Sequence, residues 1–283
     1  MSEIKILLNG ELVESEKAKI SIFDYGFLFG DSVYEVLKTV NGKVFAGKAH
    51  LERLRYSAEK TGIPIPWDDS FLIDEFYQLA DVIPGDSCYM RLVITRGVGP
   101  FSFKPSSCEI PTRILYGRVL ELMSEEVYEM GVSLMISDVR KGPTRHKSGN
   151  VKTGNYMSHV LPLHQARLQG YHEALMLNHR DQITECTTAN IFWIRQGELF
   201  TSTLKAGILN GVTRQLVLTT AKKMGMHVHR GRFTLEDLYQ ADEVFITSTT
   251  RDILPVSSVG EKKFKVGKGT RALRAAVFQK GMG

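Results

Sequence analysis

The chain has 283 residues, of which 43% are hydrophobic and 24% charged, so it is long enough for one large domain or two modest ones with real cores. Its formal net charge is +5, and it contains no apolar run near the roughly 18–20 residues of a membrane span and no signal-peptide layout at its N-terminus. Three cysteines without a Cys-x-x-Cys spacing argue against a disulfide framework or a metal site. We expect a cytoplasmic protein that does not bind a membrane.

The first 120 residues read as two Asn-Gly hairpins followed by helices and strands. Asn-Gly between strand-like residues, in "IKILLNGELV" and "YEVLKTVNGKVF", is a strong hairpin signal. Helical spacing predicts a helix in "HLERLRYSAEKTG" that ends at Gly62, and a second in "DDSFLIDEFYQLA". In the strand-like "CYMRLVITRG", alternation puts Tyr89 and Arg91 on the face opposite Met90. We assign residues 1–120, ending in the strand-like "RILYGRVL", to a small N-terminal α/β domain.

The sequence pattern changes after a segment over residues 121–131 that we interpret as a polar connector. Four strand-like runs alternate with the helical segments "YMSHVLPLHQARLQG" and "TRQLVLTTAKKMG"; the runs are 132–137, 173–178, 190–194 and 243–248. Pro162 is expected to kink the first of these helices, and His164 to pack on its apolar stripe with Met157 and Leu161. We predict a larger C-terminal α/β domain over residues 132–283.

The C-terminal end is basic, with seven Lys and Arg residues between positions 262 and 280. Such a tail can bind nucleic acid. No nucleic-acid motif accompanies it, so we favour a solvated strand and an amphipathic helix whose apolar side is Leu273, Val277 and Phe278.

Lys152, in "VKTGNYM", is a candidate nucleophile. A lysine with its ordinary pKa of about 10.4 is almost all ammonium, but burial or nearby cations free the amine to form a Schiff base with an aldehyde. Lys141, Arg145, His146 and Lys147 lie just upstream and could be those cations. From spacing alone, a solvated surface lysine remains the alternative.

Three further segments could serve a ligand. Glu185 precedes the strand that begins at Asn190, and the alternative is a loop glutamate capped by Thr187 and Thr188. "GILNGVTRQLVL" runs from a turn into a helix, whose first N–H groups favour an anion, phosphate above all. "TSTTRD" (247–252) offers a second cluster of hydroxyls and amides. A reactive lysine, a carboxylate and two anion cradles together suit pyridoxal phosphate.

Six collinear blocks, from about residue 24 to 256, resemble the class IV (fold type IV) pyridoxal-phosphate aminotransferases. The blocks are "DYGFLFGDSVYEVLKTVNGKVF", "HLERLRYSAEK", "VKTGNYM", "ITECTTANIF", "GILNGVTR" and "TSTTRDILPV". The resemblance implies a mixed α/β, two-domain fold with the cofactor between a smaller and a larger domain. It also implies a homodimer in which a partner loop closes each site.

The resemblance also implies site residues. Lys152 matches the lysine that binds the cofactor aldehyde and moves the substrate proton, and Glu185 matches the carboxylate paired with the pyridine nitrogen. Arg53 matches the phosphate-binding arginine. Val212 and Thr213 match the backbone phosphate cradle at a helix N-terminus, and Ser248 and Thr249 match a second phosphate cradle. Tyr156, or Asn155, matches a position beside the cofactor ring.

The expected substrate-side positions point to two branches of the family. Tyr34 and the short "KTGN" spacing look like the D-amino-acid branch, but Phe101 and Phe103 stand where that branch has an Arg-x-His carboxylate trap. Tyr89-Met90-Arg91 matches the Tyr-x-Arg element of the branched-chain branch, whose arginine receives the distal carboxylate of glutamate; a cross-strand ion pair is the alternative for Arg91. Thr250 is assigned to the substrate side as well.

We therefore predict a transaminase that moves an amino group between a hydrophobic, branched-chain-type amino acid and 2-oxoglutarate with ping-pong kinetics. The alternatives are a D-amino-acid aminotransferase with a non-standard carboxylate site, an aminodeoxychorismate lyase and a non-enzymatic basic nucleic-acid binder. The partners expected are small amino acids and oxo acids, with neither nucleic acid nor membrane.

Overall fold

A computed structural model describes residues 3–102, 104–142 and 151–281 of the chain. The fold divides into two compact units. The first comprises Met1–Glu121 together with Val151–Tyr156, and the second comprises Leu122–Asn150 and Met157–Gly281. The short segment Val151–Tyr156 therefore groups with the first unit, although it follows the start of the second by some thirty positions along the chain. Within the described residues, no helix is long and apolar enough to cross a membrane.

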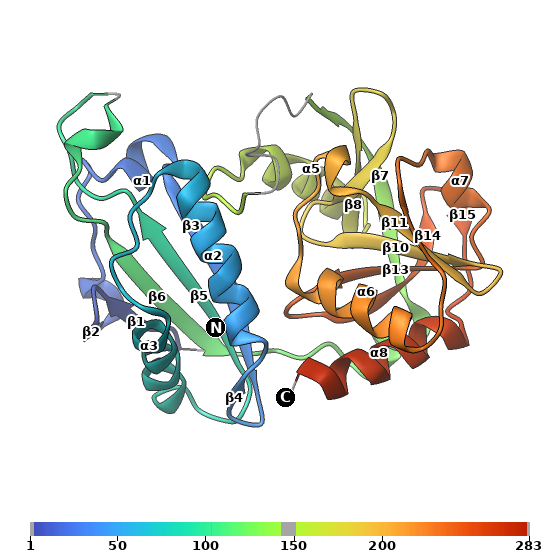
Figure 1. The fold of residues 1–283 in the computed structure, drawn as a ribbon, viewed down its shortest axis with the longest axis horizontal. Helices are drawn as coiled ribbons and strands as arrows, with labels where there is room; N and C mark the ends of the chain where they lie inside the picture. The colour runs from blue at the N-terminus through green and yellow to red at the C-terminus, as the bar shows by residue number, and fades with distance from the viewer. Residues whose placement is uncertain (1–2, 103, 143–150, 282–283) are drawn as a thin grey trace. The chain divides into compact units, whose positions relative to one another are not determined.

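The first unit is built on a six-stranded sheet in the order β2-β1-β6-β5-β3-β4, and each pair of neighbouring strands is antiparallel (Figure 1). The strands are β1 (Lys5–Leu8), β2 (Glu11–Val13), β3 (Ser32–Val40), β4 (Lys43–Val44), β5 (Cys88–Thr95) and β6 (Arg113–Val119). Both predicted Asn-Gly hairpins are confirmed. Asn9 and Gly10 have φ of 53° and 94°, the left-handed conformation that two-residue hairpin turns require.

Two helices, α2 (Gly47–Thr61) and α3 (Asp69–Asp81), pack on this sheet. Gly62, at φ 66°, ends α2 as predicted, and the side chain of Asp68 caps α3 by accepting from the Phe71 N–H. Apolar side chains of both helices meet those of β3, β5 and β6 in one core that includes Leu54, Phe76 and Met90. The unit also contains α1 (Tyr25–Phe29) and the 3₁₀ turns η1 (Ser15–Lys17) and η2 (Pro105–Ser107).

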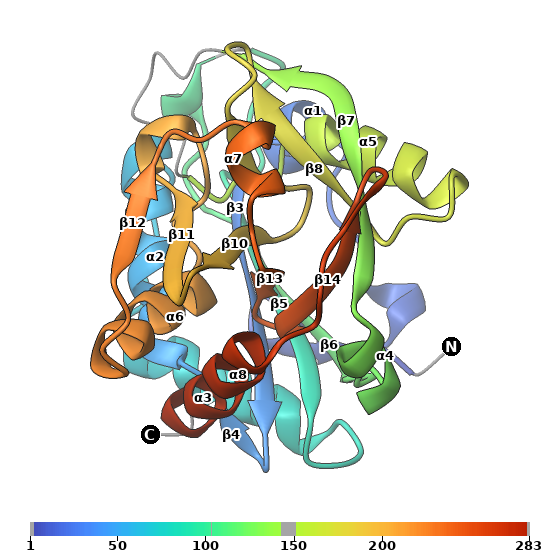
Figure 2. The ribbon, with the colours of Figure 1, turned by 90° about the vertical axis from the view of Figure 1, so that its right-hand side faces the viewer.

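The second unit holds a nine-stranded sheet in the order β12-β11-β10-β13-β14-β7-β8-β9, with β15 paired to β14. Its strands are β7 (Val132–Lys141), β8 (Glu173–Asn178), β9 (Ile183–Cys186), β10 (Asn190–Arg195), β11 (Glu198–Ser202), β12 (Val228–Gly231), β13 (Glu243–Ser248), β14 (Asp252–Val259) and β15 (Lys262–Lys263). The sheet curls on itself (Figure 2). Ile183 of β9 and Phe200 of β11 share one core, and the Ser202 hydroxyl donates to the Ile183 carbonyl.

Helices cover the second sheet from several sides. α6 (Val212–Lys223) and α8 (Lys268–Gly281) pack on β10 and β13, and Leu273 and Val277 are buried as predicted. The side chain of Phe278 lies outside the described residues. The unit also contains α4 (Glu125–Met130), α5 (Met157–Leu168), α7 (Leu235–Tyr239) and the turn η4 (Leu204–Ala206).

Two local expectations differ from the structure. Part of the expected polar connector over 121–131 is the helix α4, because its Tyr128 is buried in the main core of the second unit. The prediction of a packed His164 was wrong. α5 buries Pro162 and Ala166 instead, and leaves Met157, Leu161 and His164 exposed, because one small face is enough to pack against β7 and β8.

Candidate active site

Lys152 lies in a segment that is held against the edge of β3 by backbone hydrogen bonds. The Tyr34 N–H donates to the Lys152 carbonyl at 3.1 Å, and the Gly154 N–H donates to the Ser32 carbonyl at 2.8 Å. The Lys152 N–H in turn donates to the Ser57 hydroxyl of α2 at 3.1 Å. The backbone of Lys152 is therefore fixed in position, and the residue is half-buried rather than a fully solvated surface lysine.

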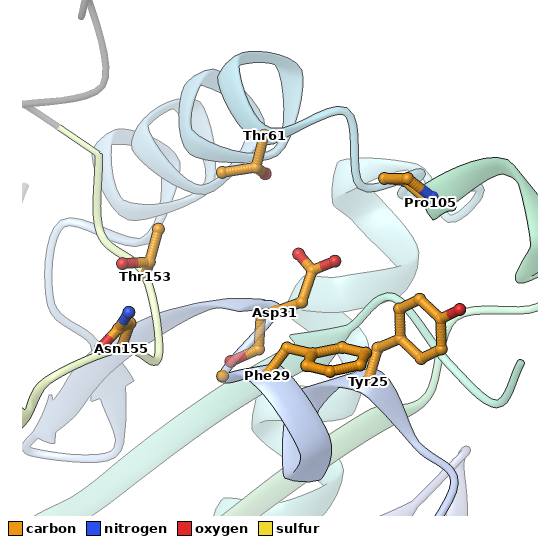
Figure 3. A pocket seen from close by; sticks show the side chains of 9 residues that line it. Tyr25, Phe29, Asp31, Thr61, Pro105, Thr153 and Asn155 are labelled. Atoms are coloured by element: carbon orange, nitrogen blue, oxygen red, sulfur yellow. The ribbon is translucent and has the colours of Figure 1, made fainter. Parts of the chain in front are cut away.

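Gly154 allows this close approach. A Cβ at this position would stand 2.0 Å from the Ser32 Oγ, so any other residue would require the Ser32 hydroxyl or the segment itself to move. Thr153 and Asn155 then line a cavity of about 360 Å³ together with Tyr25, Phe29 and Asp31 (Figure 3). Asn155 itself is exposed.

Tyr34 is a buried aromatic residue with two cations near its ring. The Lys152 Nζ lies 4.2 Å from the ring centroid, and the Arg91 Cζ lies 4.1 Å from it. Tyr156 meets Tyr34 edge to face, with ring centroids 6.0 Å apart. The Tyr34 ring thus brings the candidate nucleophile and the candidate carboxylate receptor together in the first unit.

Arg91 and Tyr89 share the face of β5 that alternation predicts. The residues opposite Arg91 on its neighbouring strands are Val36 and Tyr116, so the cross-strand ion pair considered from the sequence is wrong. Burial, and next to it the Tyr116 hydroxyl, raise the pKa of the Tyr89 hydroxyl, whereas the nearby Arg91 guanidinium acts to lower it. The Arg91 Nε is buried without a hydrogen-bond partner among the described residues. An unsatisfied cationic donor of this kind is suited to an acceptor that arrives with a ligand.

Arg53 belongs to a buried triad with Glu35 and His50. Its Nε and Nη2 donate to the two carboxylate oxygens of Glu35, each at 2.7 Å, and the His50 Nδ1 lies 2.7 Å from Glu35 Oε2. Burial alone would raise the pKa of Glu35, but the charge and hydrogen bonds of Arg53 and His50 lower it to about 2. Burial lowers the pKa of His50; the hydrogen bond and charge of Glu35 oppose this, and the positive charges of Arg53 and Lys152 add to the lowering. His50 is therefore neutral at pH 7, and its Nδ1–H donates a hydrogen bond to the Glu35 carboxylate.

Glu185 belongs to the second unit, at the end of β9. Its Oε2 accepts from the Asn190 Nδ2 at 3.1 Å and from the Leu209 N–H at 2.9 Å. Its Oε1 lies 2.7 Å from the Lys141 Nζ. Thr187 and Thr188, considered as caps for this carboxylate, bind Glu173 instead. Glu185 is thus a carboxylate fixed through one oxygen, with a cation at the other.

The N-terminus of α6 is connected to Glu185 through Asn190. Asn190, which holds Glu185, also donates to the Leu209 carbonyl at 2.9 Å, and Leu209 lies two residues before Gly211, the N-cap of α6. No described side chain caps this helix, and a Cβ on Gly211 would stand 2.2 Å from the Asn190 Oδ1. The Thr213 Oγ1 is buried without a partner in the described part of the chain. Unpaired N–H groups and a buried, unsatisfied hydroxyl form a site suited to an anion.

The second predicted cradle is the turn between β13 and β14. Ser248 pairs with Asp252 across the hairpin, so Thr249, Thr250 and Arg251 form its tip. The Arg251 Nε donates to the Ser248 hydroxyl at 3.0 Å.

Several residues of these sites were missed from the sequence. Glu35, His50 and Asn190 carry no motif of their own, since their role depends on neighbours far away in the chain. Arg214 follows Thr213, which was assigned to the phosphate from the sequence. Arg214 is buried and its Nη2 donates to the Ser202 carbonyl at 3.0 Å. Burial is the main cause that lowers its pKa to about 10. Lys141 was expected as a cation near Lys152, and its ion pair is with Glu185. Arg145, His146, Lys147 and Phe103 lie outside the described residues.

Comparisons with known proteins agree on one family. Residues 32–259 match the model of amino-transferase class IV. A Methanocaldococcus jannaschii protein that is provisionally named a branched-chain-amino-acid aminotransferase is 36% identical over 274 residues, which are 96% of this chain and 94% of the relative. A D-alanine aminotransferase of Listeria monocytogenes is 35% identical over 94% of this chain and 91% of its own.

Solved structures of the same kind share the fold. A branched-chain amino acid aminotransferase of Escherichia coli superposes with a TM-score of 0.90 at 28% identity, covering 99% of this chain and 94% of the other. Similar branched-chain aminotransferases have been solved with pyridoxamine 5'-phosphate and with N-(5'-phosphopyridoxyl)-L-glutamate.

Proposed function

This chain belongs to the class IV aminotransferase family, and on that premise we propose that it moves an amino group between a hydrophobic, branched-chain-type amino acid and 2-oxoglutarate. It is a pyridoxal-phosphate-dependent transaminase, as the family is. The observation that carries the choice of substrates is Arg91, whose partly unsatisfied guanidinium lies against Tyr34 and beside Tyr89.

The residues present fit pyridoxal phosphate. The orphaned Thr213 hydroxyl and the uncapped start of α6 suit its phosphate. The Arg53 guanidinium, held in place by its two hydrogen bonds to Glu35, adds a fixed positive charge. The cation that lies at Glu185 Oε1 indicates that this oxygen accepts a positive partner, as a protonated ring nitrogen would be. We assign the phosphate to Arg53, Val212, Thr213, Ser248 and Thr249.

Lys152 and Glu185 have separate roles in this proposal. The cofactor supplies an electron sink for the substrate Cα. Glu185 keeps the proton on the ring nitrogen, because a carboxylate beside that nitrogen favours its charged form. Lys152 holds the cofactor covalently and, once freed, takes the proton from the substrate Cα. Tyr156 and Asn155 are assigned to the surroundings of the ring.

Arg91 and Tyr89 are assigned to the distal carboxylate of glutamate or 2-oxoglutarate, with Tyr34 and Thr250 at the substrate side. A guanidinium offers a carboxylate two parallel N–H donors, and its place against an aromatic ring keeps it oriented. A hydrophobic donor substrate would use the same pocket without that ion pair.

Half-reactions test the choice of substrate. The protein loaded with pyridoxal phosphate is mixed with L-leucine, L-valine, D-alanine or D-glutamate, and the loss of the cofactor's visible absorbance is followed. We expect L-leucine and L-valine to convert it, and 2-oxoglutarate to restore it, with parallel lines in a two-substrate initial-rate plot. Conversion by D-substrates alone would favour the second candidate, and pyruvate release without any amino acceptor would reveal a lyase.

The second candidate is a D-amino-acid aminotransferase. It is favoured by the 35% identity with the Listeria D-alanine aminotransferase, which spans nearly the whole of both chains. Because Phe101 is 80% exposed and apolar, it offers no charge for a substrate carboxylate, so this candidate also needs Arg91 as its receptor.

The covalent role of Lys152 has its own test. Borohydride treatment of the loaded protein should leave a reduced phosphopyridoxyl group on the peptide that contains Lys152, as detected by mass spectrometry. Lys152→Ala should remove the label and the transaminase activity, whereas Lys147→Ala, a neighbour with the same chemistry, should retain both. Label on another lysine would contradict the proposal.

A further inference from the structure

Glu173, at the start of β8, is a buried carboxylate with no part in the proposed reaction. It is 0% exposed. The hydroxyls of Thr187 and Thr188 donate to it, and so does the Thr188 N–H at 3.2 Å. Arg251 contributes a fourth donor, its Nη1, at 2.9 Å from Glu173 Oε2. Burial alone would raise the pKa of Glu173, but Arg251 and these hydrogen bonds lower it, so the group is an ionised anchor.

Arg251 is bound through its whole guanidinium. Nε donates to the Ser248 hydroxyl, Nη1 to Glu173 and at 3.4 Å to the His172 Nε2, and Nη2 to the carbonyl and hydroxyl of Thr188. Burial, followed by the nearby positive charges, lowers the pKa of His172 to about 4, so its ring is neutral and can accept. A guanidinium has five N–H donors, and each has an acceptor here. Arg251 therefore has no donor left for a ligand.

These contacts join the two loops that the proposed function uses. Thr187 and Thr188 follow Glu185 closely, in the turn between β9 and β10. Ser248 begins the turn between β13 and β14 that is proposed to cradle the phosphate. We infer that Arg251, anchored by Glu173, is a positioning residue that fixes the phosphate-cradling turn Ser248–Thr250 relative to the loop of Glu185. The inference rests on the proposed function.

An arginine suits this role because one planar group must reach three elements at once. A lysine could keep the ion pair with Glu173, but its single ammonium nitrogen cannot also bind Ser248 and both acceptors of Thr188. Arg251→Lys thus keeps the buried charge compensated while it releases the turn. That variant separates positioning from simple charge balance.

The test compares two cofactors that differ only in the phosphate. Dissociation constants for pyridoxal 5'-phosphate and for pyridoxal are measured on the apo protein by absorbance titration, for the natural protein and for Arg251→Lys. We expect the variant to bind pyridoxal 5'-phosphate roughly tenfold more weakly or worse, and pyridoxal nearly unchanged, since a mobile cradle must be ordered on binding. Arg274→Lys is the matched control, because Arg274 pairs with Glu125 on the surface of the same unit.

Thermal unfolding accompanies both variants, so that a folding defect is recognised. If Arg251→Lys does not fold, the double variant Glu173→Gln with Arg251→Met removes both charges together and should show the same loss of phosphate preference. An unchanged ratio of the two dissociation constants, in a folded variant, overturns the inference.

The same experiment separates the two proposals. If the natural protein carries a borohydride-fixed cofactor on Lys152 but the ratio does not move in the variant, only the positioning role fails. If the natural protein shows no preference for the phosphorylated cofactor and no label on Lys152, the proposed function fails with it.

Discussion

Single residues in the first unit act through the charges buried beside them. Arg91 lies against Tyr34, and Glu35 is enclosed by Arg53 and His50. In the Glu35 arrangement, removing one partner leaves a buried group unsatisfied, whereas the Arg91 Nε is unsatisfied in the structure as it stands. The role of Arg91 can be measured in catalysis, and that of Glu35 in the stability of the fold.

Arg91→Met should change acceptor preference more than general activity. Hydrogen bonds to charged groups contribute about 1.5–3 kcal/mol each, so we expect kcat/KM for 2-oxoglutarate to fall roughly 10- to 100-fold. The value for an apolar acceptor, 4-methyl-2-oxopentanoate, should change only a few-fold. Steady-state kinetics with both oxo acids measures this.

Arg118→Met is its control, since Arg118 likewise lies over an aromatic ring of this sheet, that of Tyr89 at 5.9 Å, but its side chain is 38% exposed. An equal loss with both acceptors would place Arg91 in a role other than recognition of the distal carboxylate.

Glu35 should make the free energy of unfolding of the first unit depend on pH in the acidic range. Its pKa is lowered from 4.5 to about 2 in the fold, which corresponds to roughly 3 kcal/mol of stability. A lowered carboxyl pKa contributes fully above the unfolded value and loses that contribution as pH falls toward the folded one. Glu35→Gln should therefore be less stable than the natural protein at pH 7, and the difference should shrink between about pH 4.5 and 2.

Urea unfolding of the apo protein at a series of pH values measures this difference. Glu52→Gln, an exposed position on α2 beside Arg53 in the chain, should show no such convergence. A gap between Glu35→Gln and the natural protein that stays constant from pH 7 to pH 3 would refute the linkage.

At the scale of elements, the two sites depend on glycines that let the chain approach closely. Gly154 brings the Lys152 segment against β3, and Gly211 brings the start of α6 against Asn190. Neither has the positive φ that would explain a glycine by conformation alone. Space, and not backbone strain, is what these positions require.

Gly154→Ala should displace the Lys152 segment. The new Cβ would meet the Ser32 Oγ at 2.0 Å, and overpacking of this kind costs about 1–3 kcal/mol. We expect weaker binding of pyridoxal phosphate and slower labelling of Lys152 by borohydride. Ser32→Ala should restore both in the double variant, because the next atom, the Ser32 Cβ, stands at 3.4 Å.

Ser32→Ala alone should resemble the natural protein, which makes the four proteins a double-mutant cycle. Additive effects in that cycle would show that the Ser32 hydroxyl is not the obstacle.

At the scale of the whole molecule, short-range sequence patterns predicted most helices and strands, whereas few of the contacts between distant residues could be predicted. The Asn-Gly hairpins, the end of α2 at Gly62 and the alternation in β5 follow from backbone preferences that act within a few residues. Short strands such as β9 and β12 gave no usable pattern, because they are only four residues long. The apolar stripe of α5 predicted the wrong buried face, since its Leu161 is exposed.

The candidate site divides in the same way. The six sequence blocks indicated Lys152, Glu185 and Arg53 through resemblance, whereas Glu35 and Glu173 became visible only as partners of distant arginines. A carboxylate buried against an arginine 78 positions away leaves no local trace in the sequence. Such networks require the fold to be known.

A homodimer is proposed for the chain as a whole, and the first unit offers a surface for it. The segments around residues 23 and 99 lie together, since the Gly99 N–H donates to the Phe23 carbonyl, and both carry exposed apolar side chains. Phe27 is 65% exposed and Phe101 is 80% exposed. Exposed aromatic groups gathered in one region favour burial against another chain.

Light scattering during size-exclusion chromatography should give about 64 kDa, twice the chain mass of 31.8 kDa. Phe27→Glu with Phe101→Glu should shift the protein toward a single chain and make the mass depend on concentration, because a charge buried in an interface without a partner is unfavourable. Leu12→Glu is the control, since Leu12 is 55% exposed on a hairpin elsewhere in the same unit. The double variant could instead keep the mass of a dimer at every concentration, as Leu12→Glu is expected to do. In that case Phe27 and Phe101 are exposed to water in the dimer, and the dimer interface lies on another surface.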